Sequence, residues 1–583
     1  MVESSDLWFG TSGPHNAEIA IVGESWGSEE LQQQRPFVGE SGKELDRMLL
    51  EANILRLKCF MTNVAARKPP HNELYRLCHP FSRMLPAYRG LHLTEDLQNE
   101  LARLHNQLER VRPKLVIACG NWALWALTDC ASISSISLGN GQTVRVPAGI
   151  TSWRGSMLFS PSGLRVLPII HPAAILRAWY QRAVTVHDLR ARVPLALADD
   201  WIPQPPPKII IPATLDEAIA PLRRWIELAN GGPLRLANDI ETLNRRLITC
   251  IGFADGPFNS TGTALVIPLI RLEQNGHFES WFPPAEEAKI FKLLRTILTH
   301  PNILLEGQNY LYDTQYFQQF YGVTPRCDFD TMLAHHLLFP GTPKGLDYLS
   351  SLHCHYHRFW KEDGKDWVEK QDQLSQLRYN GEDCLRTYEV ATALRQLISN
   401  MGMSDLWRNE QRKSSLALRM MNRGILVDSS RKAAAGFELL FALQTVHRRL
   451  ESIIPDASAK KLITIKSKKK WFESERQTAQ LLYDGLGLTK QNHRKTGSVT
   501  VNDEALNVLA EKHPELSTLF ELLKAERSIN TINSDVVRAE VDPDGRMRCS
   551  FKPDGTKTFR WSSAANAFGR GMNMQNITSG DEE

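Results

Sequence analysis

Two acidic residues in the segment LRLANDIETL could hold a divalent cation. Leu234, Leu236 and Ile240 alternate with Asp239 and Glu241, so on a β-strand both carboxylates point to the same face. Two adjacent carboxylates repel each other, and they become favourable together when Mg²⁺ or Mn²⁺ lies between them. The spacing therefore indicates a metal site built on a strand.

Two later segments offer further groups for the same site. In NILLEGQNYLYDTQYF a short strand should lead into a helix, with Asn309 and Asp313 one turn apart on one face. In LRYNGEDCLRTYEV, Tyr379 and Asp383 have the same spacing, so a phenol and a carboxylate can face one site. Four carboxylates can hold two metal ions, which stabilise the attacking and leaving oxygens of an in-line displacement. One such motif alone would be read as a solvated strand edge, but three in order favour a shared site.

The order and spacing of these residues resemble the DnaQ-like 3′ to 5′ exonucleases of the tyrosine subtype, found as proofreading domains of family A DNA polymerases. The resemblance covers Lys208 to about Asn400 and implies an RNase H-like fold. It implies that two Mg²⁺ or Mn²⁺ ions are held by four carboxylates, that Tyr379 orients the attacking water, and that Asn309 contacts DNA. The catalytic set would be Asp239, Glu241, Asp313, Tyr379 and Asp383.

Three histidines close to this set could suggest a zinc site. His353, His355 and His357 alternate along the chain, but no fourth ligand is evident. A polar loop is therefore the preferred interpretation.

The carboxy-terminal part carries a lysine cluster and a second family resemblance. The segment FKPDGTKTFRWSSAANAFGRGMNMQNI resembles the TxTGRxSS and NxQNI motifs of family A polymerases, with Phe559 in place of the usual glycine. A solvated loop would explain the lysines alone, but beside this motif they suggest a thumb that grips phosphates. The implied DNA-binding residues are Lys468, Lys469, Lys470, Arg560, Asn573, Gln575 and Asn576.

The family pattern continues with palm carboxylates and a nucleotide-binding helix that this sequence lacks. The acids of the terminal ITSGDEE have no strand pattern that would place a metal ligand. We expect a split or interrupted polymerase or a fragment, without polymerisation by this chain alone. A second polypeptide is a candidate source of the missing part.

The amino-terminal part resembles the uracil-DNA glycosylase superfamily, especially family 4, from roughly Trp8 to Arg192. The segments that carry the resemblance are IAIVGESWGSEELQQQRPFVGESGKELDRML, MTNVAARKPPHN and IIHPAAILR. The resemblance implies a pocket for a flipped base. In it Phe37 would stack on the base, Asn63 would read its edge, Glu24 would stand in the water-activating loop and His171 would stabilise the charge on the departing uracil.

Two residues depart from that family's pattern. Trp26 occupies the place of a small loop residue, and Ala66 stands where the family has a cluster cysteine. We therefore expect no iron-sulfur cluster. If Trp26 fills the space of a flipped base, the domain should handle DNA without preferring or excising uracil.

The elements that must position all these residues fall into three parts. The strand-like runs IAIVG, LVIACG and VLPII, separated by helical stretches, predict a largely parallel α/β layer. A stiff proline-rich segment follows, then a second α/β pattern, then long amphipathic helices. We predict a multidomain α/β chain with a glycosylase-like domain at 1–200, a linker at 201–207, an exonuclease domain at 208–400, and a mainly helical polymerase thumb with the start of the palm at 401–583.

Length and composition fit such a chain. At 583 residues several domains are expected. A net charge of +4 is too mild to indicate nucleic acid by itself, and nine cysteines without a CxxC pair argue against a disulfide framework. No apolar run could cross a bilayer and no secretory signal is visible, so we expect no membrane role and a cytoplasmic location, that of the bacterial host if the gene is phage-encoded.

The resemblances together imply a DNA replication protein, the amino-terminal part of a family A polymerase, that acts on primer-template and single-stranded 3′ ends. A glycosylase-like domain ahead of such a polymerase resembles the arrangement in some large bacteriophages. Two alternatives stay open. One is a non-catalytic primer-template binding subunit of a split polymerase, and the other is a uracil-DNA repair glycosylase with an accessory nuclease.

Overall fold

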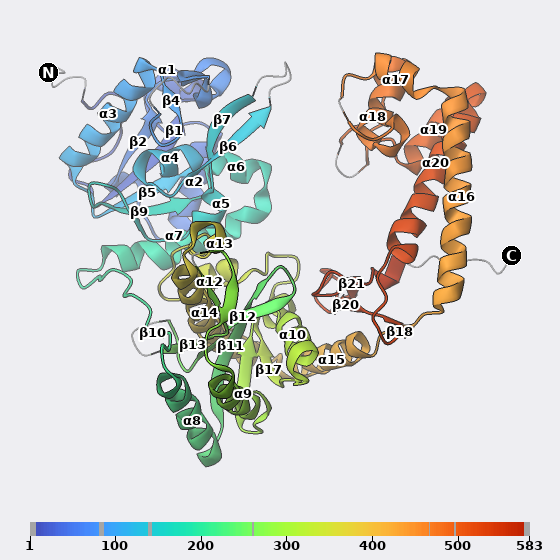
Figure 1. Ribbon diagram of the computed structural model, residues 1–583. Helices are drawn as coiled ribbons and strands as arrows, with labels where there is room; N and C mark the ends of the chain where they lie inside the picture. Colours follow the sequence, from blue (N-terminus) through green and yellow to red (C-terminus); the bar gives the residue numbers. More distant parts are fainter. Residues whose placement is uncertain are drawn as a thin grey trace. The chain divides into compact units, whose positions relative to one another are not determined.

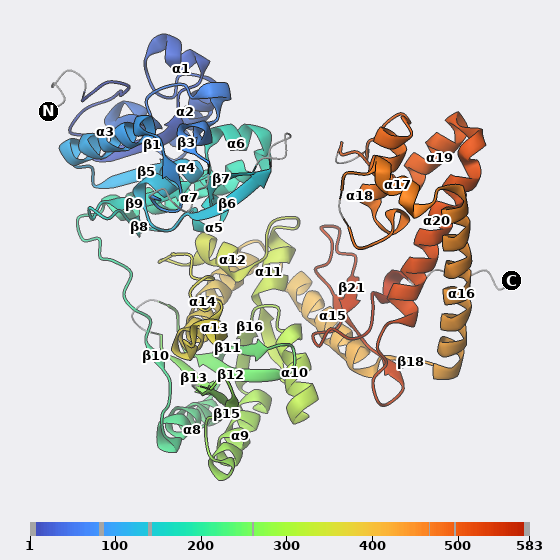
Figure 2. The same ribbon diagram turned by 45° about the horizontal axis from the view of Figure 1, so that its top comes forward.

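The chain forms two compact units, residues 1–411 and 412–583. The computed structural model describes residues 7–80, 87–137, 143–258, 262–273, 275–465, 467–494 and 497–576. Lys466 and the terminal ITSGDEE (577–583) lie outside this part. Figures 1 and 2 show two α/β regions followed by a mainly helical region, which confirms the predicted fold class.

The first region is built on a five-stranded sheet in the order β2-β1-β5-β9-β8. The parallel strands are β1 (Ile19–Ser25), β2 (Cys59–Ala65), β5 (Leu115–Cys119) and β9 (Arg165–Ile169), and the short β8 (Leu158–Phe159) runs antiparallel at the edge. Parallel strands bring their carboxyl ends to one edge, where ligands commonly bind. The three predicted strand runs are therefore confirmed, and their ends lie together.

Helices cover both faces of this sheet. Successive residues of each strand point to opposite faces, so each strand contributes apolar side chains to two cores. Ala20 and Val22 pack with α3 (Glu95–Val111) and α4 (Gly120–Leu127), whereas Ile19 and Ile21 pack with α2 (Glu40–Glu51) and α7 (Arg182–Leu197). The remaining elements of this region include α1 (Ser28–Gln33), β3 (Cys78–His79), β4 (His92–Leu93), the hairpin β6 (Ser132–Ser137) and β7 (Thr143–Ala148), α5 (Ile150–Trp153) and α6 (Pro172–Arg177). Residues 201–208 form neither helix nor strand.

The second region holds a six-stranded mixed sheet in the order β10-β13-β12-β11-β16-β17. Strand β11 pairs antiparallel with β12 and parallel with β16, so it lies in the middle of the sheet. The strands are β10 (Ile209–Ile210), β11 (Leu234–Leu243), β12 (Leu247–Ala254), β13 (Ala264–Pro268), β16 (Ile303–Gly307) and β17 (Cys327–Asp330), with a separate pair β14 (Ile270–Leu272) and β15 (Phe278–Ser280).

The long helix α14 (Gln373–Asn400) packs against β11, β12 and β13. It therefore faces the central strand that carries the paired carboxylates. The other helices of this region are α8 (Leu215–Gly231), α9 (Pro284–Thr299), α10 (Leu311–Tyr321), α11 (Thr331–Leu338), α12 (Leu346–His353) and α13 (Trp367–Lys370).

The unit 412–583 is mainly helical, as predicted. Helix α15 (Ser404–Arg423) leads into it, and α16 (Ser429–Ile453) packs along α20 (Ser517–Ile532). The smaller elements are α17 (Asp456–Leu462), α18 (Glu475–Gln480), α19 (Asp503–Lys512) and the strand pairs β18 (Ile425–Leu426) with β19 (Arg546–Met547) and β20 (Cys549–Lys552) with β21 (Ser562–Ala565).

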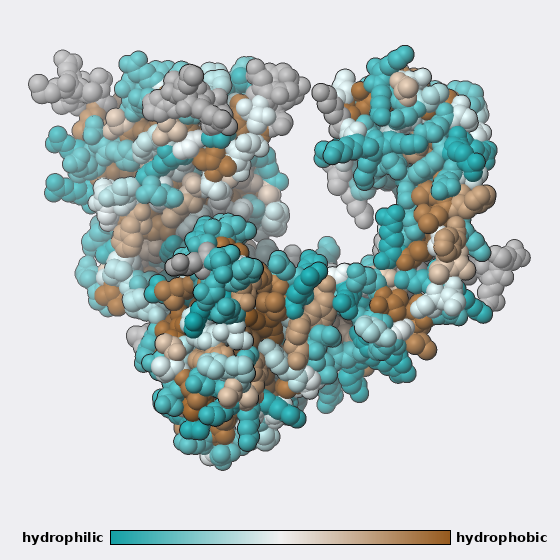
Figure 3. Space-filling model, in the orientation of Figure 1, coloured by the Kyte–Doolittle hydropathy of each residue, from teal (hydrophilic) through white to brown (hydrophobic). Residues whose placement is uncertain are grey.

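Part of α16 exposes large apolar side chains. Phe437 and Phe441 are 75% and 68% exposed, and Figure 3 shows hydrophobic residues gathered along this helix. Within the described ranges, no helix has the length and apolar character needed to span a bilayer.

Candidate active site

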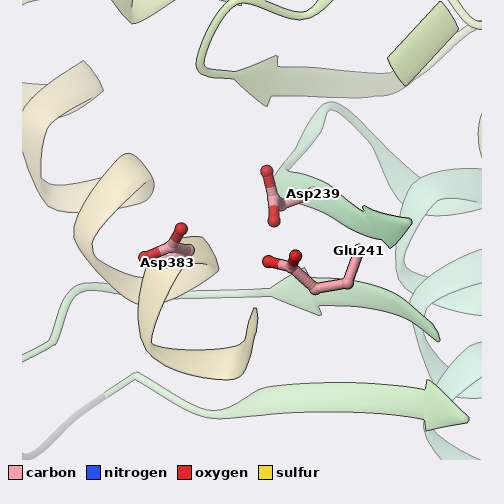
Figure 4. A group of neighbouring side chains, drawn as sticks. All are labelled: Asp239, Glu241 and Asp383. Carbon is pink, nitrogen blue, oxygen red and sulfur yellow. The ribbon is translucent and has the colours of Figure 1, made fainter. Parts of the chain in front are cut away.

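Three carboxylates from two elements meet in the second region (Figure 4). Asp239 and Glu241 lie on β11, and Asp383 comes from the facing helix α14. Each offers an oxygen within 4.8 Å of the other two. The extended strand places alternate side chains on one face, so the predicted pair does point toward a single site.

Asp313 lies beside this group, on helix α10. Its Oδ1 accepts a hydrogen bond of 3.1 Å from the backbone N–H of Ile240, the residue between Asp239 and Glu241. The side chain is buried, but it is not a member of the group of three within 4.8 Å. Its bond to β11 holds it next to the two strand carboxylates.

Asn309 does not share a helical face with Asp313. Helix α10 begins at Leu311, and Asn309 has a left-handed backbone with φ 55°. The Asp330 carboxylate accepts hydrogen bonds from the N–H groups of Asn309 and Tyr310, at 3.2 and 2.8 Å, which holds a turn ahead of the helix. The predicted one-turn spacing on a helix is therefore wrong, although Asn309 is exposed at that turn.

Burial and mutual repulsion raise the pKa values of these carboxyl groups. Burial, followed by the charge of Asp383, raises the pKa of Asp239 to about 8. Burial and the charge of Asp239 hold the pKa values of Glu241 and Asp313 well above their usual range. Carboxylates that resist ionisation together fit a site completed by divalent cations, whose charge would favour the ionised forms.

Tyr379 and Asp383 lie one turn apart on α14, as predicted, and both contact Lys361. The Lys361 Nζ donates to the Tyr379 hydroxyl at 2.7 Å and to Asp383 Oδ2 at 2.6 Å. Burial alone would lower the pKa of Lys361, but Asp383 and the other carboxylates raise it. Burial and the same carboxylates raise the pKa of Tyr379, so its phenol stays protonated.

Two further side chains fix the carboxylates. The Trp360 indole N–H donates to Asp383 Oδ1 at 2.6 Å, and the Asn380 amide donates to Asp239 Oδ2 at 2.8 Å. Sequence reasoning missed Trp360, Lys361, Asn380 and Asp330. Asn380 adjoins Tyr379 and could have been found there. Lys361 lies in an irregular loop, where no helical or strand periodicity predicts that it lies near Tyr379.

In the first region, Phe37 and Asn63 close around the end of β1. A β-carbon at Gly23 would lie 2.6 Å from both the Phe37 ring and the Asn63 amide, so glycine permits this approach. Phe37 has φ 54°, which is strained for a large side chain. The guanidinium of Arg56 donates to its carbonyl at 2.9 Å and holds the backbone.

Asn63 has an unused hydrogen-bonding atom at this place. Its amide nitrogen donates to the Ser25 carbonyl at 3.4 Å. Its Oδ1 is buried and accepts no hydrogen bond within the described part of the chain. A buried acceptor without a partner is costly, so a ligand with an N–H group would fit here.

Glu24 and His171 lie at the same edge of the sheet, Glu24 near the end of β1 and His171 just after β9. Burial raises the pKa of Glu24 to about 7. Burial, followed by the charge of Arg177, lowers the pKa of His171 to about 4. The Nδ1 of His171 accepts from the N–H of Ala173 at 3.2 Å, so the neutral ring carries its proton on Nε2.

The region around Trp26 does not fit a four-cysteine cluster. Ala66 offers no ligand atom, and a β-carbon at Gly10 would lie 2.5 Å from the Ala66 Cβ and 2.9 Å from the Trp26 ring. The Trp26 ring also packs against Phe9 at 5.5 Å between centroids. These contacts place apolar groups side by side around Ala66.

Comparison with known proteins connects these two sites to families. Residues 9–190 match the uracil DNA glycosylase superfamily. Residues 220–399, which contain every carboxylate of the second site, match the 3′-5′ exonuclease family of the DNA polymerase A type. The chain joins a glycosylase-superfamily domain to a 3′-5′ exonuclease domain. The predicted resemblances to the glycosylase superfamily and to the 3′-5′ exonucleases are thus confirmed.

Each of the following relatives is similar to only part of this chain. Type-4 uracil-DNA glycosylases of Thermotoga maritima and Archaeoglobus fulgidus are each 28% identical, over 28% of this chain and 69% of theirs. The DNA polymerase of Escherichia phage T5 is 28% identical over 27% of this chain and 18% of its own length. The solved POL domain of Pol1 from M. smegmatis, in complex with DNA primer-template and dNTP, has a TM-score of 0.44 and 21% identity, over 62% of this chain and 56% of that one.

Beyond the exonuclease domain, the predicted DNA-binding lysines differ in their surroundings. Lys468 and Lys469 are exposed, whereas Lys470 forms an ion pair with Glu451. Two lysines are thus presented to solvent, and the third is partly neutralised.

The described part of the motif, residues 551–576, folds as a braced hairpin. Phe559 has φ 61°, a left-handed conformation that glycine adopts more readily than a residue with a side chain. Ser563 donates to Asn573 Oδ1 at 2.5 Å, and the Gln575 amide donates to the Trp561 carbonyl at 3.0 Å. Arg560 is exposed at the turn, and Asn576 lies in the short helix Met574–Asn576, its side chain outside the described part.

Proposed function

We propose that the chain carries the proofreading part of a family A DNA polymerase and removes nucleotides from 3′ ends of DNA. The observation that carries this proposal is the group of Asp239, Glu241 and Asp383 within 4.8 Å, inside a domain of the 3′-5′ exonuclease family. Substrates are single-stranded 3′ ends and frayed primer-templates, and the products are deoxynucleoside monophosphates.

The carboxylates Asp239, Glu241, Asp313 and Asp383 would hold two Mg²⁺ or Mn²⁺ ions. When bound, such ions neutralise phosphate charge and activate water for in-line attack. Asn380 orients Asp239, while Lys361 and Trp360 orient Asp383. The protonated Tyr379 hydroxyl lies at the same site, where it can hold a water by hydrogen bonding.

A nuclease assay tests the proposal. An end-labelled primer-template with a mismatched 3′ end, incubated with Mg²⁺, should be shortened one nucleotide at a time. The double variant Asp239→Ala, Glu241→Ala should lose this activity by roughly 10³-fold or more, since metal contributions amount to several kcal/mol. A double variant that degrades DNA at the rate of the wild type would refute the assignment.

We assign the unit 412–583 to primer-template binding as the polymerase thumb and the start of the palm. The exposed Lys468 and Lys469 support this assignment. Replacing either with Ala should weaken duplex binding for all sequences and reduce the slope of log K against log salt by about one. Lys460, paired with Asp456 at 2.6 Å, is the matched control. A second polypeptide that completes the polymerase stays a prediction.

A second candidate function is uracil recognition and excision by the amino-terminal domain. The buried Asn63 Oδ1 without a donor favours it, because uracil presents an N–H on the edge that a flipped base exposes. The neutral His171, with its proton on Nε2, could donate to the oxygen that becomes negative as the base leaves. This candidate function contradicts the expectation, drawn from Trp26, that the domain handles DNA without preferring or excising uracil.

Uracil-containing duplex tests this candidate directly. Alkali-labile sites should form at uracil in the wild type and disappear in Asn63→Ala and His171→Ala, while the exonuclease rate is unchanged. Equal affinity for uracil and thymine duplexes, with no abasic product, would instead support the expectation from Trp26.

A further inference from the structure

A short segment of the exonuclease domain contacts both domains of the first unit. This bridging segment, residues 354–361, is irregular and follows helix α12. Its neighbouring aromatic residues face different domains. Phe359 belongs to the hydrophobic core of the glycosylase-like domain, where it packs edge-on against Trp153 at 5.3 Å. Trp360 is fully buried and donates to the carboxylate Asp383.

The glycosylase-like domain holds the start of this segment through a buried arginine. Arg192 on α7 donates to the backbone carbonyls of Ser351, Cys354 and His355, at 2.8, 3.1 and 2.7 Å. Arg192 is 5% exposed, and its bonds to Ser351 and Cys354 are buried. Three bonds from one rigid group fix the path of the chain there.

Further contacts continue along the segment. The Met157 N–H donates to the His357 carbonyl at 3.1 Å, and the Phe359 N–H donates to the Ser156 hydroxyl at 3.1 Å. Arg154 donates to the Ser351 hydroxyl at 3.1 Å and forms a buried ion pair with Asp188. The glycosylase-like domain thus contacts the chain from Ser351, near the end of α12, to Phe359 in the bridging segment.

The other end of the segment lies in the exonuclease site. Trp360 and Lys361 donate to the two different oxygens of Asp383, each at 2.6 Å, which fixes the plane of that carboxylate. Arg386 of α14 stacks on the Trp360 ring at 4.1 Å and donates to the Tyr356 carbonyl. The orientation of Asp383 therefore depends on where the segment runs.

We propose that Trp360 and Lys361 are positioning residues of the exonuclease, and that the glycosylase-like domain keeps them in place by holding the bridging segment through Arg192. The inference rests on the proposed exonuclease function. It gives the amino-terminal domain a role in proofreading that does not depend on base excision.

Mn²⁺ binding by the full chain, measured by calorimetry without DNA, tests the positioning role apart from activity. Trp360→Phe keeps the ring but removes the N–H, so Mn²⁺ affinity should fall about tenfold. Lys361→Met should lower the exonuclease kcat while Mn²⁺ binding stays equal or becomes tighter, because a competing cation is removed. Lys361→Arg should restore part of the kcat. Wild-type Mn²⁺ affinity in Trp360→Phe would overturn this role.

The role of the glycosylase-like domain is tested with Arg192→Met and, should that variant fail to fold, with Phe359→Leu. Either should weaken Mn²⁺ binding, and combining Arg192→Met with Trp360→Phe should cost less than the sum of the two. Arg103→Met is the matched control, since Arg103 is a largely buried arginine of the same domain, and its hydrogen bonds to described residues all lie inside that domain. It should lower the melting temperature but leave Mn²⁺ affinity unchanged.

Two results would overturn the domain coupling. One is wild-type Mn²⁺ affinity in a folded Arg192→Met or Phe359→Leu variant, and the other is an equal loss in Arg103→Met. An absence of nuclease activity in the wild type would count against the proposed function instead, because the Mn²⁺ titrations do not depend on it.

Discussion

At the scale of single residues, Asp239 determines how the metal-free protein responds to pH. Its pKa lies near 8 in the folded chain and near 3.9 in an unfolded one. Between these values the folded state binds more protons than the unfolded state, so stability falls as the pH rises from about 4 to about 8. Glu241 and Asp313, whose pKa values are also raised, act in the same direction.

Asp239→Asn should therefore stabilise the metal-free protein. Its advantage in melting temperature over the wild type, measured in EDTA, should grow between about pH 4 and about pH 8 and then level off. Saturating Mg²⁺ should reverse the order, because only the wild type gains from binding the cation. An advantage that does not change with pH would contradict the raised pKa.

Tyr379 offers a second test at this scale. Tyr379→Phe removes the hydroxyl that faces Asp383 and Lys361, and the exonuclease kcat should fall about 10²-fold if that hydroxyl orients water. Mn²⁺ affinity should stay close to that of the wild type. Tyr388→Phe, on the same helix but stacked on Arg235, is the control and should retain its rate.

At the scale of elements, the hairpin of β20 and β21 depends on one strained residue. Phe559 has φ 61°, a conformation that costs a residue with a side chain roughly 1–2 kcal/mol and costs glycine little. Phe559→Gly should therefore be more stable than Phe559→Ala by about 1 kcal/mol in denaturant unfolding. Both variants lose the ring, so the comparison isolates the backbone. Equal stabilities would show that the turn relaxes.

The elements show what the sequence could predict. The alternation around Asp239 and the apolar strand runs were sufficient to predict strands β11, β1, β5 and β9. Alternation and continuous apolar runs are local signals that can be read from a short stretch of sequence. The turn at Asn309 was not predicted, because it is held by Asp330, 21 residues away in the chain. Trp360 and Lys361 were missed for the same reason. Their bonds to Asp383 are long-range contacts made by an irregular loop, which has no periodic sequence pattern.

At the scale of the whole molecule, two compact units predict separable activities. A shortened chain of residues 1–423, which keeps all of α15, should fold and shorten single-stranded oligonucleotides at a rate close to that of the full chain. It should bind primer-template duplex more weakly and with a smaller salt dependence, because Lys468, Lys469 and Arg560 are lost. Fluorescence anisotropy over a range of salt concentrations measures this, and unchanged duplex affinity would contradict the assignment.

The contact between Arg192 and the bridging segment also has an evolutionary consequence. Arg192 binds main-chain carbonyls, and every amino acid supplies a main-chain carbonyl. Substitutions at Cys354 and His355 in the exonuclease domain should therefore leave these bonds intact. Selection should therefore act on the Arg192 side chain and not on the side chains of the residues it binds. Among homologues with this domain fusion, an arginine should persist at position 192 while side chains at 354 and 355 vary, and homologues that lack the fused domain should be released from keeping a phenylalanine at 359.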